Sequence, residues 1–470
     1  MQLSRSYHAK RADEQKLSYL GSINPAWALP LERVQFSPPY LHQVGITYDA
    51  PVVGKGYIKL YYRDFIVEEI SADGEVVPTN TARNFSDDEL TVKRPKVRAT
   101  LIKQGMATQE ATERLAEALS VPVQSIGYAG LKDGRALTSQ DISFNGPTVE
   151  EVRAIKLGNL TLRDIYSSNE IVSAGQLQGN RFTILVRCAP EAAERVRQGI
   201  SVLLADGVPN FYSLQRFGSR LAAHKIGRLL IQQQYEAAVR EYLIGKSPYE
   251  TFTLQNFREE AGSHWGQWEQ MAATFSELPY FFYYELVMLQ ALQQKPRDFA
   301  GAFAAIPEQA KMMVYAYTSY YYNLLLSSRV QRGNVTPELP ILRADPEVQR
   351  IYREVVSDEE LHAARFYHPD LPFLQLNKPQ SVGSYLRPTI HQVVPLEHGV
   401  LLHFDLQKGA YATTLLAHLF HLYQYKPVPV WVNEQLYDGK AILGVGSLDE
   451  TESLLNKYSN PDTDASLLDD

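Results

Sequence analysis

The segment from Ile126 to Phe144 holds the residues of this sequence that are best suited to chemistry. Asp133 lies between two glycines, with Lys132 directly before it and Arg135 two positions after it. A carboxylate held near cations stays ionised and can act as a nucleophile or a base. An ordinary hairpin turn is the alternative, because Lys-Asp-Gly is a common turn sequence. Taken alone, the segment favours the turn.

Regular elements are predicted on both sides of this segment. Thr108 is expected to be the N-cap of a helix with Glu110 in its first turn, where a carboxylate faces the positive end of the helix dipole. Apolar residues then recur at helical spacing, at Ala111, Leu115 and Leu119. The helix leads into the Asp133 segment, so we expect Asp133 in a loop on a rigid scaffold, where catalytic groups concentrate.

Alternation of apolar and polar residues predicts several strands. They cover Tyr57–Leu60, Arg63–Ile70, Gly179–Arg187 and Leu401–Leu406. A helix is predicted from Pro190, and residues 220–328 are mainly helical in pattern and rich in aromatic residues. Stacking platforms for bases are one interpretation of those aromatic residues, but packed helical cores are favoured, since large aromatic side chains dominate core energetics.

The composition is that of a globular chain. Of 470 residues, 45% are apolar and 21% charged, which is enough for two or three domains with sizeable cores. The single cysteine, Cys188, excludes an internal disulfide framework and a cysteine-rich metal site, and it favours a reducing compartment. The first 16 residues lack the apolar core of a signal peptide, and no apolar run reaches the roughly 20 residues that span a bilayer. We therefore expect a soluble, cytoplasmic protein.

The net charge of −7 is distributed unevenly. Residues Asp449–Asp470 hold seven acidic residues against one lysine, which gives −6, so nearly all of the excess acidity lies in a C-terminal tail. Residues Thr91–Lys103 hold five basic residues and no acid, which gives +5. A solvated charged loop and a phosphate-binding patch are both consistent with that basic cluster.

The Asp133 segment carries a resemblance to a known family. Residues Ala129–Gln140, AGLKDGRALTSQ, closely resemble the signature of the TruD family of pseudouridine synthases. Further segments resemble the same family in the same order, and together they extend the resemblance from about Gly56 to Leu416. These segments are Lys59 with Asp64–Glu69, Gly179–Phe182, Pro209–Gly218, the weaker Ala316–Asn323, and Lys408–Thr413. The chain departs from the family pattern at Gly134, where a basic residue is usual, and at Ser213, which replaces a glycine.

The resemblance implies an α+β fold. Its catalytic domain would be a pseudouridine-synthase domain, with a mixed, mainly antiparallel sheet flanked by helices, interrupted by a TruD-type inserted α/β domain. The boundaries expected from it are 1–50 for an N-terminal extension, 51–207 and 389–430 for the two segments of the catalytic domain, 208–388 for the inserted domain, and 431–470 for the acidic tail.

The same resemblance implies isomerisation of uridine to pseudouridine in tRNA, in the position-13 class of tRNA uridines. This reaction breaks the N1–C1′ bond and forms a C5–C1′ bond, so it requires no redox change, metal or cofactor. Asp133 would be the catalytic carboxylate, as a nucleophile toward C1′ or C6 or as a base for the C2′ proton. The expected partner is tRNA, with other RNAs as further candidates, no membrane, and a monomeric chain. A non-catalytic RNA-binding protein that retains the fold is the alternative.

The other site residues follow the family pattern. Lys59 would lie near Asp133 and lower its pKa, although a solvent-exposed strand lysine is the plain alternative. Lys132 and Arg135 would contact phosphate. The target uridine would have to be unstacked from folded RNA before Asp133 could reach it.

Two residues of the predicted 179–187 strand and one residue at the domain junction complete the set. Phe182 would stack on the extruded base, although its pattern alone indicates a strand core residue. Asn180 would bind the base edge or the loop that carries Asp133, with a structural cap as the alternative. Arg216, next to Gln215, would contact the RNA backbone or belong to a structural hydrogen-bond network.

Overall fold

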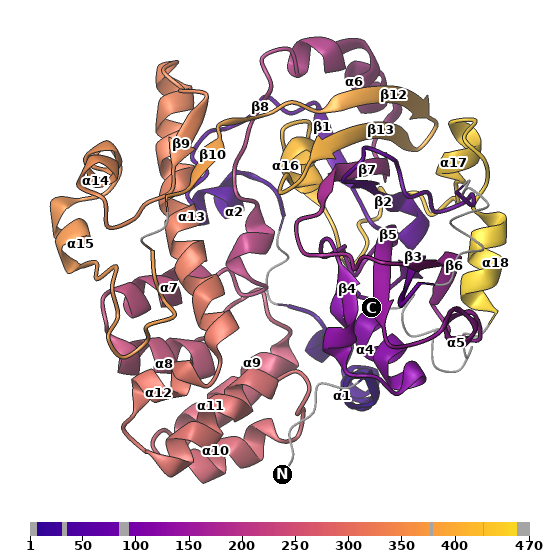
Figure 1. Cartoon of the computed structure of the whole chain (residues 1–470). Helices are drawn as coiled ribbons and strands as arrows, with labels where there is room; N and C mark the ends of the chain where they lie inside the picture. The colour runs from indigo at the N-terminus through magenta and orange to yellow at the C-terminus, as the bar shows by residue number, and fades with distance from the viewer. Residues whose placement is uncertain (1–6, 31–34, 84–93, 377–378, 426, 458–470) are drawn as a thin grey trace. The chain divides into compact units, whose positions relative to one another are not determined.

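A mixed sheet is the centre of one of the two units into which the chain divides. The computed structural model describes residues 7–30, 35–83, 94–376, 379–425 and 427–457 (Figure 1). One unit, here the sheet unit, contains Val52–Val208 and Arg387–Asp470. The other, here the helical unit, contains Met1–Pro51 and Pro209–Leu386. Each unit is therefore assembled from two stretches that are far apart in the sequence.

The sheet of the sheet unit has eight strands in the order β12-β13-β7-β2-β5-β3-β6, with β4 paired to β5 outside that path. Their bounds are β2 Phe65–Ser71, β3 Lys96–Gln104, β4 Ile126–Tyr128, β5 Leu137–Asn145, β6 Leu160–Ser168, β7 Leu177–Val186, β12 Thr389–Leu396 and β13 Gly399–Gln407. The pair β2–β5 is parallel and the other pairs are antiparallel. A separate parallel pair joins β1, Gly54–Tyr57, to β14, Phe420–Tyr423. The predicted α+β class with a mixed, mainly antiparallel sheet is confirmed.

Helices cover both faces of this sheet. They are α4 Thr108–Leu119, α5 Val149–Arg153, α6 Pro190–Leu203, α16 Ala412–Ala417, α17 Gly439–Ile442 and α18 Asp449–Asn456, with the 3₁₀ turns η2 Tyr62–Asp64 and η3 Val123–Ser125. The apolar stripe of α4, with Ala111 and Leu115, packs on Leu101 and Ile142 of the sheet. Because side chains alternate along a strand, Ile102 points to the opposite face, where α18 packs.

Part of the predicted acidic tail forms ordered helices of the sheet unit. Leu448 and Leu455 of the α18 region are fully buried against Ile66 and Ile102. In α17, Lys440 forms an ion pair with Glu68 of β2 at 2.5 Å, with both side chains almost fully buried. Acidic residues in the first turn of α18 lie at the positive end of its helix dipole, where their negative charge stabilises the helix. The remaining acids, Asp462, Asp464, Asp469 and Asp470, lie outside the described residues.

The helical unit consists mainly of helices. They are α1 Tyr7–Ile23, α2 Pro38–Gln43, α7 Ala223–Ile231, α8 Tyr235–Ile244, α9 Phe252–Ser263, α10 Trp268–Phe275, α11 Tyr283–Gln294, α12 Phe299–Ala304, α13 Pro307–Arg332, α14 Pro346–Tyr352 and α15 Asp358–Ala363, with the 3₁₀ turns η1 Pro25–Ala28 and η4 Leu214–Phe217. Its described strands are short, β9 Glu338–Pro340, β10 Ser381–Gly383 and β11 Tyr385–Leu386, and β8, Val208–Pro209, lies at the unit boundary. The helical pattern predicted for 220–328 is confirmed, whereas little sheet is present in the segment expected to be α/β.

The N-terminal residues belong to the helical unit. Asp13 of α1 accepts hydrogen bonds from the backbone N–H groups of Tyr280 (2.8 Å) and Phe281 (3.1 Å), just before α11. Lys16 forms an ion pair with Glu277 at 2.7 Å. The first helix is thus attached through polar contacts to the entry of α11. Within the described ranges, no helix is both long and apolar enough to cross a membrane.

The packing of α18 leads to a prediction about stability. Leu455→Ala removes a fully buried side chain from the core against β2 and β3, so we expect a loss of about 2–5 kcal/mol in the free energy of unfolding of the sheet unit. Leu436→Ala is the matched control, because Leu436 is 58% exposed in the same unit and its loss should cost less than about 0.5 kcal/mol. Chemical denaturation of both variants measures the difference. Equal stability of the two variants would show that α18 is not part of the core.

Candidate active site

Asp133 lies in the connection between β4 and β5. The last residue of β4, Tyr128, pairs with Ile142, far along β5, so the two strands are not joined by a tight hairpin turn. The turn that the segment alone favoured is therefore wrong. The connection is instead a longer loop that enters β5 at Leu137, next to Ile66 of β2. This arrangement brings Asp133 to the middle strands of the sheet.

Polar side chains hold the loop on both sides of Asp133. Thr108 accepts a hydrogen bond from the backbone N–H of Lys132 (2.9 Å) and donates one to the side chain of Gln140 (3.0 Å). Gln140 in turn donates to the carbonyl of Gly130 (3.0 Å). The N-cap of α4 is Ala107, so the expected capping role of Thr108 is wrong. Its hydroxyl is used to fix the loop instead.

Lys132 points into the protein. Its ammonium forms an ion pair with Glu69 of β2 at 2.6 Å, and the two side chains are 2% and 1% exposed. Glu69 also accepts a hydrogen bond from the backbone N–H of Asp141 (3.2 Å). The charge of Lys132 is thus neutralised inside the sheet unit, where it ties the loop to β2, and its contact with substrate stays a prediction.

A second buried lysine supports the backbone at Asp133. Lys103 of β3 is fully buried and donates to the carbonyls of Met106 (2.7 Å) and Asp133 (3.1 Å). Burial lowers the pKa of Lys103 to about 7. Arg98 from the same basic cluster forms an ion pair with Asp141 at 3.1 Å. At these two residues the cluster is neither a solvated loop nor a phosphate patch, and Lys93 lies outside the described residues.

Lys59 forms an ion pair with the carboxylate of Asp133. The side chain of Lys59 is only 3% exposed, and its ammonium lies 4.4 Å from the ring centroid of Phe65. Because β1 ends at Tyr57, the predicted strand through Lys59 and the alternative of an exposed strand lysine are both wrong. Lys59 has φ = 61°, a left-handed conformation that is strained for a residue with a side chain. Such strain persists where surrounding contacts define the position, as the ion pair does here.

These contacts determine the charge state of Asp133. Burial opposes its ionisation, but the charge and hydrogen bond of Lys59, a hydrogen bond from the backbone N–H of Arg135 (2.8 Å) and the charge of Lys103 outweigh burial and lower the pKa of Asp133. The side chain remains 26% exposed. Asp133 is thus ionised and still reachable from solvent, as a nucleophile or base must be.

Arg135 presents its charge beside this carboxylate. Its guanidinium carbon lies 4.5 Å from the ring centroid of Tyr425, a cation–π distance. No carboxylate of the described residues forms an ion pair with Arg135. Tyr425 is 40% exposed and lies just beyond the segments that suggested the family, so sequence reasoning missed it. Together they form a cationic and aromatic surface that fits phosphate or a base.

Asn180 and Phe182 lie on one face of β7, two positions apart. Phe182 is 5% exposed, stacks on Phe404 with centroids 5.3 Å apart, and meets the edge of Phe65 at 6.3 Å. In this structure it is a core residue, and its stacking on a base stays a prediction. Asn180 pairs in register with Glu69, and its side-chain oxygen is buried with no hydrogen-bond partner in the described part of the chain.

Phe182 contacts Phe65, whose ring lies against the ammonium of Lys59. Asn180 pairs in register with Glu69, which forms the ion pair with Lys132. The structure therefore brings Lys59, Lys132, Asp133 and the β7 residues together in the sheet unit. Arg216 belongs to the helical unit, where its guanidinium carbon lies 5.0 Å from the ring centroid of Tyr212.

Sequence reasoning missed residues that act on the loop from the interior. Glu69 and Gln140 lie in strands, and nothing in the alternation of apolar and polar residues distinguishes them. Lys103 was visible only as one member of a basic cluster. Two acids that directly follow the apolar run Phe65–Val67 in one strand are the one signal that could have indicated a buried ion pair.

Comparison with known proteins identifies the family. The family model "tRNA pseudouridine synthase D (TruD)" matches residues 46–340. The "Probable tRNA pseudouridine synthase D" of Methanopyrus kandleri is 32% identical over 350 residues, which cover 68% of this chain and 84% of that protein. The "Probable tRNA pseudouridine synthase D 1" of Methanocaldococcus jannaschii is 28% identical over 387 residues, covering 77% and 94% of the two chains.

The fold is similar to that of a solved structure. The crystal structure of the putative tRNA pseudouridine synthase D from Methanosarcina mazei matches with a TM-score of 0.56 and 24% sequence identity, covering 81% of this chain and 97% of that chain. The family match extends over more than half of the sequence and includes the loop that holds Asp133 against Lys59. The chain therefore belongs to the tRNA pseudouridine synthase D (TruD) family, the isomerases that convert uridine to pseudouridine in tRNA.

Proposed function

We propose that Asp133 is the carboxylate that acts on a uridine extruded from tRNA, in the position-13 class of tRNA uridines. The observation that carries this proposal is the ion pair between Asp133 and Lys59, which keeps a partly exposed carboxylate ionised although burial opposes its charge. Attack on C1′ or C6 and removal of the C2′ proton all begin from the ionised form. The charge state supports any of the three routes and does not distinguish them.

The residues around Asp133 suggest how the uridine is held. Reaching a base in folded RNA requires unstacking it, and an aromatic ring against that base offsets about 1–3 kcal/mol. Phe182 is proposed for this contact, which would require the base to enter beside the Phe65–Phe182–Phe404 row. Asn180 is proposed to accept a hydrogen bond from the N3–H of uracil, because a buried acceptor without a partner is costly.

Phosphate groups next to the uridine are proposed to contact Arg135, whose guanidinium has no carboxylate partner among the described residues. Arg216 is proposed as an RNA contact of the helical unit. We further propose that residues 208–388 form the inserted TRUD domain and that 51–207 and 389–430 form the two segments of the catalytic domain. Lys132 is proposed as a positioning residue rather than as a substrate contact, because Glu69 holds its charge.

A non-catalytic RNA-binding protein is the second candidate. Pure binding of RNA gains nothing from a carboxylate that faces phosphate groups, because like charges repel. In this chain the carboxylate is held ionised by three separate groups, which favours catalysis over binding alone.

Asp133→Asn should abolish pseudouridine formation while tRNA binding is retained, because the substitution removes the charge and little volume. Asp206→Asn is the matched control, since Asp206 is exposed in the same unit, and it should leave the reaction unchanged. Mapping pseudouridine in tRNA treated with each protein, together with a binding titration, measures both effects. Equal modification by wild type and Asp133→Asn would exclude Asp133, and no modification by wild type on any RNA would favour the binding protein.

Lys59→Met should move the acidic limb of the kcat/KM profile to higher pH. Lys59 lowers the pKa of Asp133 against the effect of burial, so without it the carboxyl group protonates at a higher pH and activity is lost sooner as pH falls. Lys59→Arg keeps the positive charge, so its acidic limb should lie closer to that of wild type than the limb of Lys59→Met does. Single-turnover rates across the pH range test this expectation. An acidic limb that does not move in Lys59→Met would show that it does not report on Asp133.

Lys103→Met should lower kcat by about 10²-fold with little change in KM, because the backbone of the Asp133 loop loses its support and the carboxylate moves from its position. In the folded protein Lys103 loses its proton near pH 7, whereas in the unfolded chain it keeps it to about pH 10.4. Between these two pH values the unfolded state therefore binds more protons than the folded state. The titration of Lys103 thus makes the free energy of unfolding of wild type increase as pH rises.

The same pH-dependent term is absent from Lys103→Met. The stability of wild type relative to this variant should therefore increase between about pH 7 and 10, which thermal unfolding at several pH values measures. A constant difference across that range would show that Lys103 titrates normally and supports the loop without a shifted pKa.

A further inference from the structure

The helical unit contains a pocket of about 300 Å³ that involves none of the residues around Asp133. It lies between the segment from Gln215 to Arg220, which begins within η4, and the helices α7, α8, α9, α11 and α13. This volume is at the lower end for small-molecule sites. The charged side chains that line it are Arg216, Arg220, Arg258, Glu250 and Glu285.

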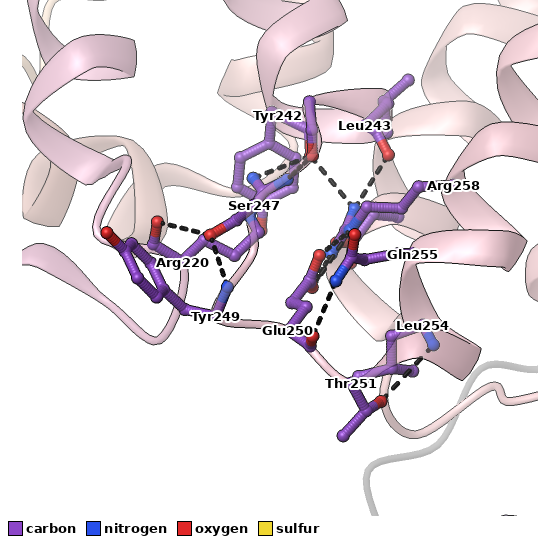
Figure 2. A network of polar contacts seen from close by, with 12 residues as sticks. Arg220, Tyr242, Leu243, Ser247, Tyr249, Glu250, Thr251, Leu254, Gln255 and Arg258 are labelled. Atoms are coloured by element: carbon purple, nitrogen blue, oxygen red, sulfur yellow. Dashed lines mark hydrogen bonds and ion pairs between the residues drawn. The ribbon is translucent and has the colours of Figure 1, made fainter. Parts of the chain in front are cut away.

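Several residues that line the pocket belong to one network of ion pairs and hydrogen bonds (Figure 2). Arg258 pairs with Glu250 at 2.9 Å and with Glu285 at 3.0 Å, and it donates to the carbonyl of Leu243 at 2.8 Å. These three charged side chains are 6–8% exposed. Arg258 is therefore fully paired within the protein. Glu285 uses only Oε1 in these contacts, and its Oε2 accepts no hydrogen bond from a described residue.

Two other arginines at the pocket have no carboxylate partner among the described residues. Arg220 donates only to the carbonyls of Gly245 (2.8 Å) and Tyr242 (3.0 Å), as Figure 2 shows for Tyr242. Burial, and after it the nearby charge of Arg258, lowers the pKa of Arg220, and the charges of Glu250 and Glu285 offset this effect only in part. The guanidinium of Arg216 makes no hydrogen bond to a described residue, and its Nε is buried. Both groups therefore lack a compensating anion in direct contact.

The backbone between these arginines and the rim around them favour a ligand. Gly218 has φ = 75°, a conformation that L side chains rarely adopt, and it lies between Arg216 and Arg220, which both line the pocket. At the rim, Phe281 is 40% and Met312 is 54% exposed, so the pocket has accessible apolar surface beside its arginines. The pocket thus combines guanidinium groups, which suit phosphate, with apolar surface, which suits a flat ring.

We propose that this pocket binds one nucleotide unit, with its phosphate against Arg216 and Arg220 and its base against Phe281 and Met312. The free oxygen of Glu285 would accept a hydrogen bond from the N–H edge of the base, which an inorganic phosphate cannot provide. A free mononucleotide and one nucleotide of an RNA chain share this chemistry. The proposal does not depend on the role of Asp133.

Isothermal titration calorimetry with UMP, AMP and inorganic phosphate tests the pocket. Wild type should bind at least one mononucleotide more than about tenfold more tightly than phosphate, because only the nucleotide reaches the apolar rim. Met312→Glu places a carboxylate at the rim and should weaken nucleotide binding by about tenfold or more, whereas the matched neutral variant Met312→Gln should bind within about threefold of wild type. Because Met312 is exposed, neither variant should lower the unfolding temperature appreciably.

Competition with tRNA distinguishes the two sources. Displacement of the nucleotide by tRNA, with a KM for tRNA that is higher in Met312→Glu than in Met312→Gln, would assign the pocket to the RNA substrate. Nucleotide binding that persists under saturating tRNA would assign it to a free nucleotide. Asp133→Asn should bind the nucleotide like wild type, so a failure of the proposed catalytic role leaves this test intact.

Three outcomes would overturn the proposal. One is the absence of nucleotide binding together with equal KM values for tRNA in wild type and both Met312 variants. Another is equal affinity for phosphate and nucleotides, which would leave the base without a site. The third is nucleotide binding that Met312→Glu does not weaken, which would locate the nucleotide elsewhere.

Discussion

A carboxylate must remain charged in a site where little water reaches it, and much of the sheet unit serves this constraint. Burial of Asp133 favours its neutral form, and the ammonium of Lys59 offsets that effect through an ion pair. Lys59 itself is almost fully buried in a left-handed backbone conformation. Removing one partner of such a pair leaves an uncompensated charge, at a typical cost of 3–5 kcal/mol. Each residue therefore depends on the other for its stability as well as for its charge.

The loop around this ion pair is positioned by strand β2, which carries two acidic residues in succession. Because neighbouring side chains of a strand point to opposite faces, Glu68 and Glu69 serve different partners. Glu69 holds Lys132 and so fixes the residue next to Asp133, while Glu68 holds Lys440 of α17 on the other face. Charges are costly to bury, so the two buried ion pairs of this strand depend on each partner being in place, and through Lys132 this fixes the position of the loop.

In the helical unit the buried charges are arranged differently. Arg258 forms ion pairs with Glu250 and Glu285. Arg216 and Arg220 form no ion pair with a carboxylate of the described residues, and Arg220 donates to backbone carbonyls instead. Arginines with and without a carboxylate partner thus line the same pocket, and they differ in whether the described residues supply a counter-charge in direct contact. The same distinction separates Lys132 from Arg135 in the sheet unit, although both flank one aspartate in the sequence.

The amino-acid sequence by itself indicated several of the elements and the family. Alternation of apolar residues located β2, β7 and β13, helical spacing located α4 and the long helical region, and collinear motifs indicated Asp133, Lys59, Asn180 and Phe182, because these patterns are local. Only the tertiary structure decided which charges face inward. The buried pairs join residues far apart in the chain, such as Lys132 with Glu69 and Lys440 with Glu68. Burial decides whether a lysine is paired inside the protein or accessible to solvent, and burial has no local signal in the sequence. Tertiary packing likewise made Thr108 a support for the loop instead of a cap, and it enclosed Lys103, because burial depends on all the elements that surround a side chain.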